Sequence, residues 1–172
     1  MEPNHSIYPE NKMECYALLK AQIKALLDGE TNVIANLANA SALLNEALTD
    51  INWVGFYLRD GEELILGPFQ GRPACVHIAS GRGVCGTAVL QNRTLIVPDV
   101  HRFPGHIACD CDSASEIVIP LHGGGADSAE QIVGVLDIDS PITGRFDEED
   151  ARELEQAAAV IQAACWPESP YQ

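Results

Sequence analysis

Positive charge is scarce in this sequence. Its 172 residues include 10 Lys and Arg against 25 Asp and Glu, which gives a formal net charge of −15. A chain this acidic repels the phosphate backbone of nucleic acids and the anionic surface of membranes. We therefore expect neither nucleic acid nor a membrane among its partners.

Long apolar runs are also absent. No segment approaches the roughly 20 apolar residues that a membrane-spanning helix needs. The first residues do not place a basic start before an apolar segment, as a secretory signal would. We expect a cytoplasmic protein with one domain over residues 1–172, whose core runs from about 14 to 165 between a loose N-terminal lead and a loose C-terminal tail.

Several catalytic signatures are missing as well. There is no glycine-flanked serine turn of a hydrolase, and the segment GRGVCG has neither the lysine of a phosphate loop nor the glycine spacing of a dinucleotide site. A zinc site is disfavoured, because Cys109 and Cys111 are separated by one residue and no second cysteine pair accompanies His101 and His106. We expect no metal and no cofactor.

Helices are predicted in three places. Apolar residues recur at helical spacing over Met13–Leu27 and over Asn32–Leu48, which predicts a helical hairpin that covers one face of a sheet. A third helix is expected over Glu148–Ala164, with Asp147 as its N-cap.

Strands predominate between these helices. The turn Asp60-Gly61 favours a hairpin, and a short helical run is expected at Thr87–Leu90. Connections of this kind predict a largely antiparallel sheet with helices packed on it, which is an α+β fold. The predicted strands are 52–58, Glu63–Phe69, Ala74–Ala79, Leu95–Val97, Ile117–Leu121 and Ile132–Ile138.

Six cysteines are many for a cytoplasmic chain, in which thiols stay reduced unless a disulfide is catalytic. Cys75, Cys85 and Cys109 lie at strand ends or in loops rich in glycine and polar residues, and Cys85 is expected near the N-terminus of a helix. Cys109 lies in a long irregular connection, 101–115, of the kind that often carries function. We interpret Cys15 and Cys165 as structural.

Two aspartates share one face of a predicted strand. In the segment VLDIDS, Asp137 and Asp139 point to one side while Leu136 and Ile138 point into the core. The pair either holds an ammonium group or marks a strand end that reaches solvent.

Other side chains have two readings each. Glu116 opens the strand that follows the loop of Cys109, so it either lies beside that thiol or is a charge at a strand edge. Trp53 and Tyr57, separated on their strand face by Gly55, either form the wall of a small pocket or pack in the core.

Six segments make the chain similar to a known family. In order, these are INWVGFYL, LGPFQGRPAC, GRGVCGTA, VPDVHRFPGHIACD, SEIVIPL and GVLDIDSP. They resemble the free methionine-(R)-sulfoxide reductases, which have the GAF fold, and the similarity runs from about Glu14 to Gln162.

The resemblance implies a six-stranded antiparallel GAF sheet, reduction of free methionine-(R)-sulfoxide to methionine, recycling by thioredoxin and pairing into homodimers. Cys109 matches the catalytic cysteine, with Cys75 as the principal resolving thiol and Cys85 as its competitor. The substrate pocket of the family is matched by Glu116, Asp137, Asp139, Trp53 and Tyr57.

The chemistry agrees with this assignment. A thiolate attacks the sulfoxide sulfur once its oxygen accepts a proton, and Glu116 or one of the aspartates is the expected donor. Oxygen transfer leaves a sulfenic acid that a second thiol converts into a disulfide. Backbone amides within residues 105–112 are expected to bind the substrate carboxylate.

The chain departs from the family in two places. Cys111 adds a thiol two residues after Cys109, and the loop 122–131 is longer than usual. The alternative function is that of a GAF sensor that binds a small molecule without turnover.

Overall fold

A six-stranded antiparallel sheet forms the centre of the computed structural model, which describes residues 7–105, 112–123 and 131–167. The strand order is β3-β2-β1-β6-β5-β4, and every neighbouring pair is antiparallel. The strands are β1 (Trp53–Asp60), β2 (Glu63–Gly71), β3 (His77–Ala79), β4 (Leu95–Val97), β5 (Ser115–His122) and β6 (Ile132–Ser140). The predicted α+β class and antiparallel sheet are confirmed.

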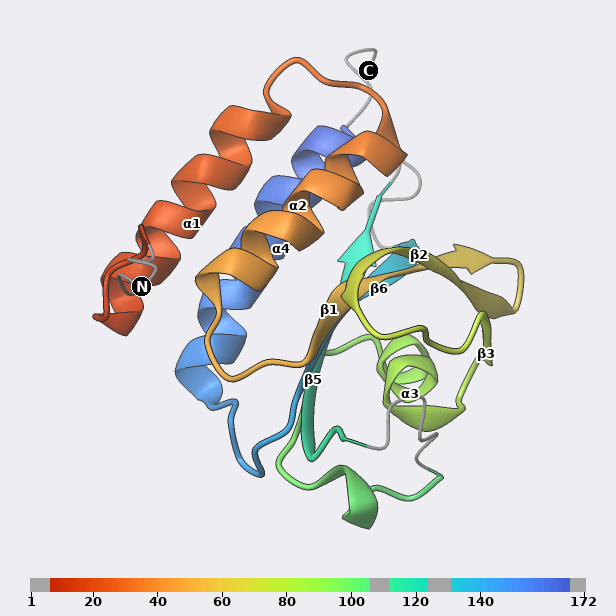
Figure 1. Cartoon of the computed structure of the whole chain (residues 1–172). Helices are drawn as coiled ribbons and strands as arrows, with labels where there is room; N and C mark the ends of the chain where they lie inside the picture. Colours follow the sequence, from red (N-terminus) through yellow and green to blue (C-terminus); the bar gives the residue numbers. More distant parts are fainter. Residues whose placement is uncertain (1–6, 106–111, 124–130, 168–172) are drawn as a thin grey trace.

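Helices lie on both faces of this sheet (Figure 1). On one face, α2 (Val33–Ala47) packs against β1 and β2, and α4 (Glu148–Cys165) packs against β5. The first helix, α1 (Lys12–Leu27), packs chiefly on α2 and α4. On the other face lies α3 (Gly83–Gln91), and a short 3-10 turn, Val100–Arg102, follows β4.

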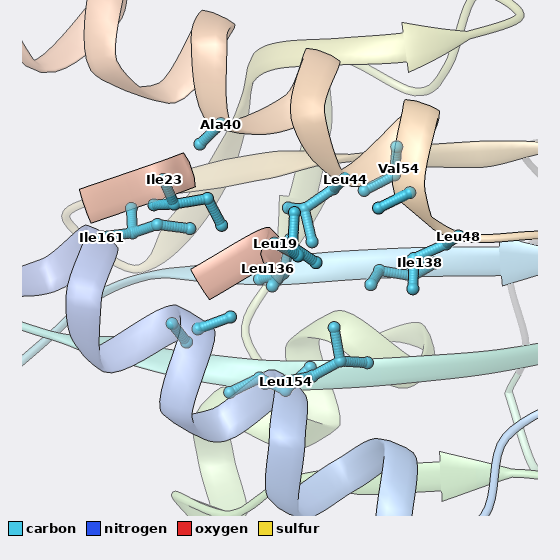
Figure 2. Packing of buried hydrophobic residues seen from close by; sticks show 14 of the residues in the cluster. Leu19, Ile23, Ala40, Leu44, Leu48, Val54, Leu136, Ile138, Leu154 and Ile161 are labelled. Atoms are coloured by element: carbon cyan, nitrogen blue, oxygen red, sulfur yellow. The ribbon is translucent and has the colours of Figure 1, made fainter. Parts of the chain in front are cut away.

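The larger hydrophobic core lies between the sheet and the layer of α1, α2 and α4. Leu19 and Ile23 of α1, Leu44 of α2 and Leu154 of α4 are fully buried there. Figure 2 shows these side chains gathered around Leu136 and Ile138 of β6. The predicted inward direction of Leu136 and Ile138 is therefore confirmed.

A smaller core occupies the opposite face, beneath α3. Trp53 and Tyr57 belong to it, together with Val84 and Cys85 of α3. Alternation along β1 explains this division, since Val54 and Phe56 lie in the larger core while their neighbours face α3. The candidate site is built on this second face.

Asp147 caps α4 as predicted. Its side chain accepts hydrogen bonds from the backbone N–H groups of Glu149 and Asp150, and Asp150 in return accepts one from the backbone N–H of Asp147. This reciprocal capping box satisfies donors that the first turn of a helix leaves free.

Three predicted elements needed correction. The strand predicted over Ala74–Ala79 is only His77–Ala79, because the preceding segment bends so that the Cys75 carbonyl accepts a hydrogen bond from the Tyr57 hydroxyl. The helix predicted at Thr87–Leu90 begins earlier, at Gly83. The helical hairpin does not cover the sheet by itself, because α2 and α4 share that role and α1 packs mainly on them.

Within the described residues, every helix is too short or too polar to cross a lipid bilayer.

Candidate active site

The three central strands bring the predicted site residues together. Asp139 of β6 is the direct cross-strand partner of Trp53 on β1 and of Glu116 on β5. Asp137, two residues earlier on the same face, lies opposite Gly55 of β1. Residues from three separate segments of the sequence thus meet on one patch of the sheet.

This patch forms the floor of a cavity of about 40 Å³ that α3 covers. An enclosed water needs roughly 10–15 Å³, so the space suits a small molecule rather than a nucleotide. The cavity is lined by Trp53, Tyr57, Pro73, Ala74, Ile78, Arg82, Gly83, Val84, Cys85, Ser113, Glu116, Asp137 and Asp139.

Stacked aromatic rings form one wall of the cavity. The ring of Trp53 lies 5.9 Å from that of Tyr57 and 5.2 Å from that of Phe69, with interplanar angles of 25° and 16°. Gly55 makes this stack possible, because a Cβ atom there would lie 2.3 Å from the Cβ of Phe69 and 2.8 Å from the Trp53 ring. The aromatic pair therefore both packs in the smaller core and lines the cavity.

The glycines around Cys85 allow α3 to approach the sheet. Gly83 has a φ of +60°, which side-chain-bearing residues rarely adopt. A Cβ atom on Gly86 would lie 2.5 Å from the carbonyl oxygen of Ala79. Cys85 consequently lies in the first turn of α3 and not before it, with its thiol directed into the cavity.

Cys85, Glu116 and Asp137 form a buried acidic cluster at the floor of the cavity. Their exposed fractions are 3%, 6% and 6%. The Cys85 Sγ atom lies 4.0 Å from Oε1 of Glu116, and Oδ1 of Asp137 has no hydrogen-bond partner among the described residues. A buried polar atom without a partner is costly, so this oxygen is available for a ligand.

Burial controls the protonation of this cluster. It raises the pKa of Glu116 well above its usual value, and the neighbouring charges of Asp137 and Asp139 raise it further. It also raises the pKa of Asp137 to about 6. The Cys85 thiol has a strongly raised pKa because of burial first and the Asp137 and Glu116 charges second.

Two side chains of β1 hold the segment that carries Cys75. The Tyr57 hydroxyl donates to the Cys75 carbonyl at 3.0 Å, and the Trp53 indole N–H donates to the Arg72 carbonyl at 3.1 Å. Cys75 is disulfide-bonded, whereas Cys85 is a free thiol. The remaining free thiols of the described residues, Cys15 and Cys165, lie on α1 and α4, away from the cavity.

Two predicted features lie outside the described residues. Cys109 and Cys111 fall within 106–111, and most of the longer loop falls within 124–130. Asp112, which follows the first of these segments, forms an ion pair with Arg72.

Some lining residues escaped the sequence analysis. Arg82, Val84 and Ser113 border the cavity, and Phe69 supports its aromatic wall. A signal for Phe69 was present, because a glycine between two aromatic residues on one strand face leaves room for a ring from the neighbouring strand. No pattern marked Ser113, since only the packing of separate segments places it.

The comparisons with known proteins cover most of the chain. Residues 25–165 match the GAF domain. The chain is 56% identical over 152 residues to the Escherichia coli (strain K12) protein named free methionine-R-sulfoxide reductase. The matched region covers 88% of this chain and 89% of that protein.

Two solved structures with substrate are similar to this one. The fRMsr of Staphylococcus aureus in complex with substrate has a TM-score of 0.79 and 56% identity, over 87% of this chain and 94% of that one. The free methionine-R-sulfoxide reductase of Neisseria meningitidis in complex with its substrate has a TM-score of 0.85 and 44% identity, over 91% of each chain.

Proposed function

Because this chain belongs to the free methionine-(R)-sulfoxide reductases of the GAF domain family, as its sequence predicted, we propose that it reduces free L-methionine-(R)-sulfoxide to L-methionine. The similarity to relatives named as reductases supports the assignment of this chain as an oxidoreductase. The observation that carries the proposal is the cavity beneath α3, in which three carboxyl groups face a stacked aromatic wall.

The substrate enters this cavity as a free amino acid. Asp137, with its unpartnered buried oxygen, and Asp139 beside it hold the ammonium group. Trp53 and Tyr57 contact the methyl and methylene groups. An acylated or peptide-bound methionine sulfoxide lacks this ammonium group and is a poor substrate.

The first chemical step transfers oxygen from substrate sulfur to the enzyme. The Cys109 thiolate attacks the sulfoxide sulfur while Glu116, kept protonated by burial, donates a proton to the sulfoxide oxygen. The sulfur–oxygen bond of the substrate breaks, methionine leaves, and Cys109 becomes a sulfenic acid.

Cys75 resolves the sulfenic acid by forming a disulfide with Cys109 and releasing water. The disulfide-bonded state of Cys75 and the free thiol of Cys85 support this choice. The raised pKa of Cys85 also favours Cys75, because it leaves little Cys85 thiolate to attack the sulfenic acid.

Thioredoxin then opens the disulfide by exchange, and its own dithiol is oxidised. The sum of the steps converts methionine sulfoxide and reduced thioredoxin into methionine, water and oxidised thioredoxin. The cytoplasmic location, the homodimer and the single domain over 1–172 remain predictions that accompany this proposal.

Replacement of single thiols tests the proposal. We expect Cys109→Ser to release no methionine, Cys75→Ser to release about one methionine per site and then stop, and Cys165→Ser to match the parent. Methionine is quantified by chromatography with and without thioredoxin, and free thiols are titrated before and after substrate. Repeated turnover by Cys109→Ser would show that the nucleophile is a different residue. An unchanged thiol count in the parent after substrate is added would indicate a binding protein without turnover.

Cys111 has a defined place in the same experiment. A disulfide between Cys109 and Cys111 would close a small, strained ring, and such bonds are labile. We therefore expect Cys111→Ser to turn over with thioredoxin at nearly the parent rate. Loss of recycling with intact first turnover would instead identify Cys111 as the resolving thiol.

A further inference from the structure

The buried cluster at the cavity floor contains more ligand atoms than the ammonium clamp and the proton donor use. The Cys85 thiol plays no part in the proposed reaction. Its Sγ atom and one carboxylate oxygen from each of Glu116 and Asp137 all lie within 4.8 Å of one another. Burial raises the pKa of both carboxyl groups, and hydrogen bonds from Cys85 and Glu116 partly offset this rise at Asp137.

Asp137 provides independent evidence for a ligand at this point. It is 6% exposed, and its Oδ1 atom lacks a hydrogen-bond partner among the residues that the structure describes. The same residue lines the cavity. The Asp137 side chain forms hydrogen bonds with Cys85 and Glu116, so its carboxyl group is held beside both groups while Oδ1 stays unpartnered among the described residues. A buried oxygen held in this way beside a thiol and a second carboxyl group matches the environment of a metal ligand.

We propose that Cys85, Glu116 and Asp137 bind a thiophilic divalent cation, of the class of Zn²⁺, Co²⁺ or Cd²⁺, which occupies the cavity in competition with the amino acid. One thiolate and two carboxylates favour these ions over Mg²⁺ and Ca²⁺, which prefer all-oxygen ligands. The cavity supplies a fourth, open position. On binding, the Cys85 thiol and the Glu116 carboxyl group, which burial keeps protonated, each release a proton to solvent.

The three ligand atoms lie somewhat farther apart than in an occupied zinc site. Zinc bonds of about 2.3 Å to sulfur and about 2.0 Å to oxygen place tetrahedral sulfur and oxygen ligands about 3.5 Å apart. The observed separation between Cys85 Sγ and Glu116 Oε1 is 4.0 Å. All three ligand atoms lie within 4.8 Å of one another, so side-chain rotation must draw them together when the ion binds.

Competition follows from shared groups. A bound cation occupies Asp137 and Glu116, which the substrate needs for its ammonium group and its sulfoxide oxygen. Free methionine should therefore displace the cation, and the cation should inhibit reduction. The metal site itself does not depend on the proposed activity, while the competition does.

Cobalt titration of the oxidised protein tests the site, because Cys75 is then tied in its disulfide and Cys85 is free. A thiolate-to-cobalt charge-transfer band in the near ultraviolet should saturate at one ion per chain. Cys85→Ser should abolish the band, Glu116→Gln should weaken affinity at least about tenfold, and Cys165→Ser, which removes another buried free thiol, should retain it.

Three results would overturn the proposal: no band in the parent, a band that survives Cys85→Ser, or a band that is lost equally in Cys165→Ser. If the band behaves as expected but saturating methionine does not displace the metal, the shared cavity is wrong. Circular dichroism verifies folding, and activity measured with a chelator present tests the reductase proposal separately.

Discussion

Replacing Asp137 by Asn should weaken substrate binding and stabilise the fold at the same time. The two residues have nearly the same shape, so the change removes a charge without creating a cavity. Asp137 is buried, and its Oδ1 atom has no hydrogen-bond partner among the described residues. Its carboxylate is therefore placed for a ligand at a cost to the empty protein.

The effect on binding follows from removing one partner of a buried charge pair. Such a change costs about 2–5 kcal/mol, which corresponds to a loss of roughly 30-fold to 4,000-fold in kcat/KM for free methionine sulfoxide. Asp139→Asn is the matched control on the same strand face. Because Asp139 is only half-buried, its loss should be smaller.

The effect on stability has the opposite sign. Burial raises the pKa of Asp137 from 3.8 to about 6, so ionisation of Asp137 lowers the stability of the parent as pH rises through this window. The amide variant lacks this contribution, while the loss through Glu116 is common to both proteins. The difference should grow in favour of Asp137→Asn by on the order of 3 kcal/mol between pH 4 and pH 7. Urea unfolding at both pH values, in the presence of a chelator, measures it.

A substrate without its amino group completes the test. With 4-(methylsulfinyl)butanoate, Asp137→Asn should cost little, because no ammonium group remains to be held. An equal loss of kcat/KM on both substrates would refute the clamp and would leave Asp137 with a role in chemistry or positioning. A stability difference that does not change with pH would refute the burial argument.

Three other predictions concern the scaffold. Tyr57→Phe should lower stability by about 0.5–1.5 kcal/mol and slow disulfide formation at Cys75 without reducing the first methionine released, as quenched-flow analysis would show; unchanged recycling would contradict this. Gly86→Ala, which in an ordinary helix would stabilise, should lower Tm and weaken methionine binding, because the new Cβ meets a backbone oxygen at 2.5 Å; calorimetry decides its sign. Asp147→Ala should lower the free energy of unfolding by about 0.5–2 kcal/mol, because a helix cap is lost. Asp147→Asn keeps an oxygen that can cap the helix. Hydrogen bonding to Lys12 lowers the pKa of Asp147 to about 2, so the greater stability of the parent over Asp147→Asn should disappear as pH falls from about 4 towards 2.

Local patterns in the sequence were sufficient for the fold and for much of the candidate site. Alternation with a period of two places Trp53 and Tyr57 on one face of β1, and Asp137 and Asp139 on one face of β6. This regularity depends only on strand geometry, so it can be read without knowing what the strands contact. Hairpin connections predicted the antiparallel sheet, the family resemblance added the six-stranded GAF fold, and the structure confirms both.

Boundaries of short elements depended on contacts between distant segments. The strand before α3 is shortened where the Cys75 carbonyl is bound by Tyr57, a residue 18 positions earlier in the chain. No local propensity encodes such a hydrogen bond. The first turn of α3 lies close to the strand before it, since a Cβ atom on Gly86 would be 2.5 Å from the carbonyl oxygen of Ala79.

Tertiary structure alone decided the electrostatics of the site. The register of β5 against β6 places Glu116 opposite Asp139. The packing of α3 on the sheet brings Cys85 to the floor of the same cavity. Burial by these separate segments raises the pKa of Glu116 and of Cys85, which suits the first to donate a proton and the second to remain a thiol. The sequence by itself determined which side chains share a strand face, because that depends on neighbours along the chain; their protonation depends on desolvation by residues far away in sequence, which exists only in the folded molecule.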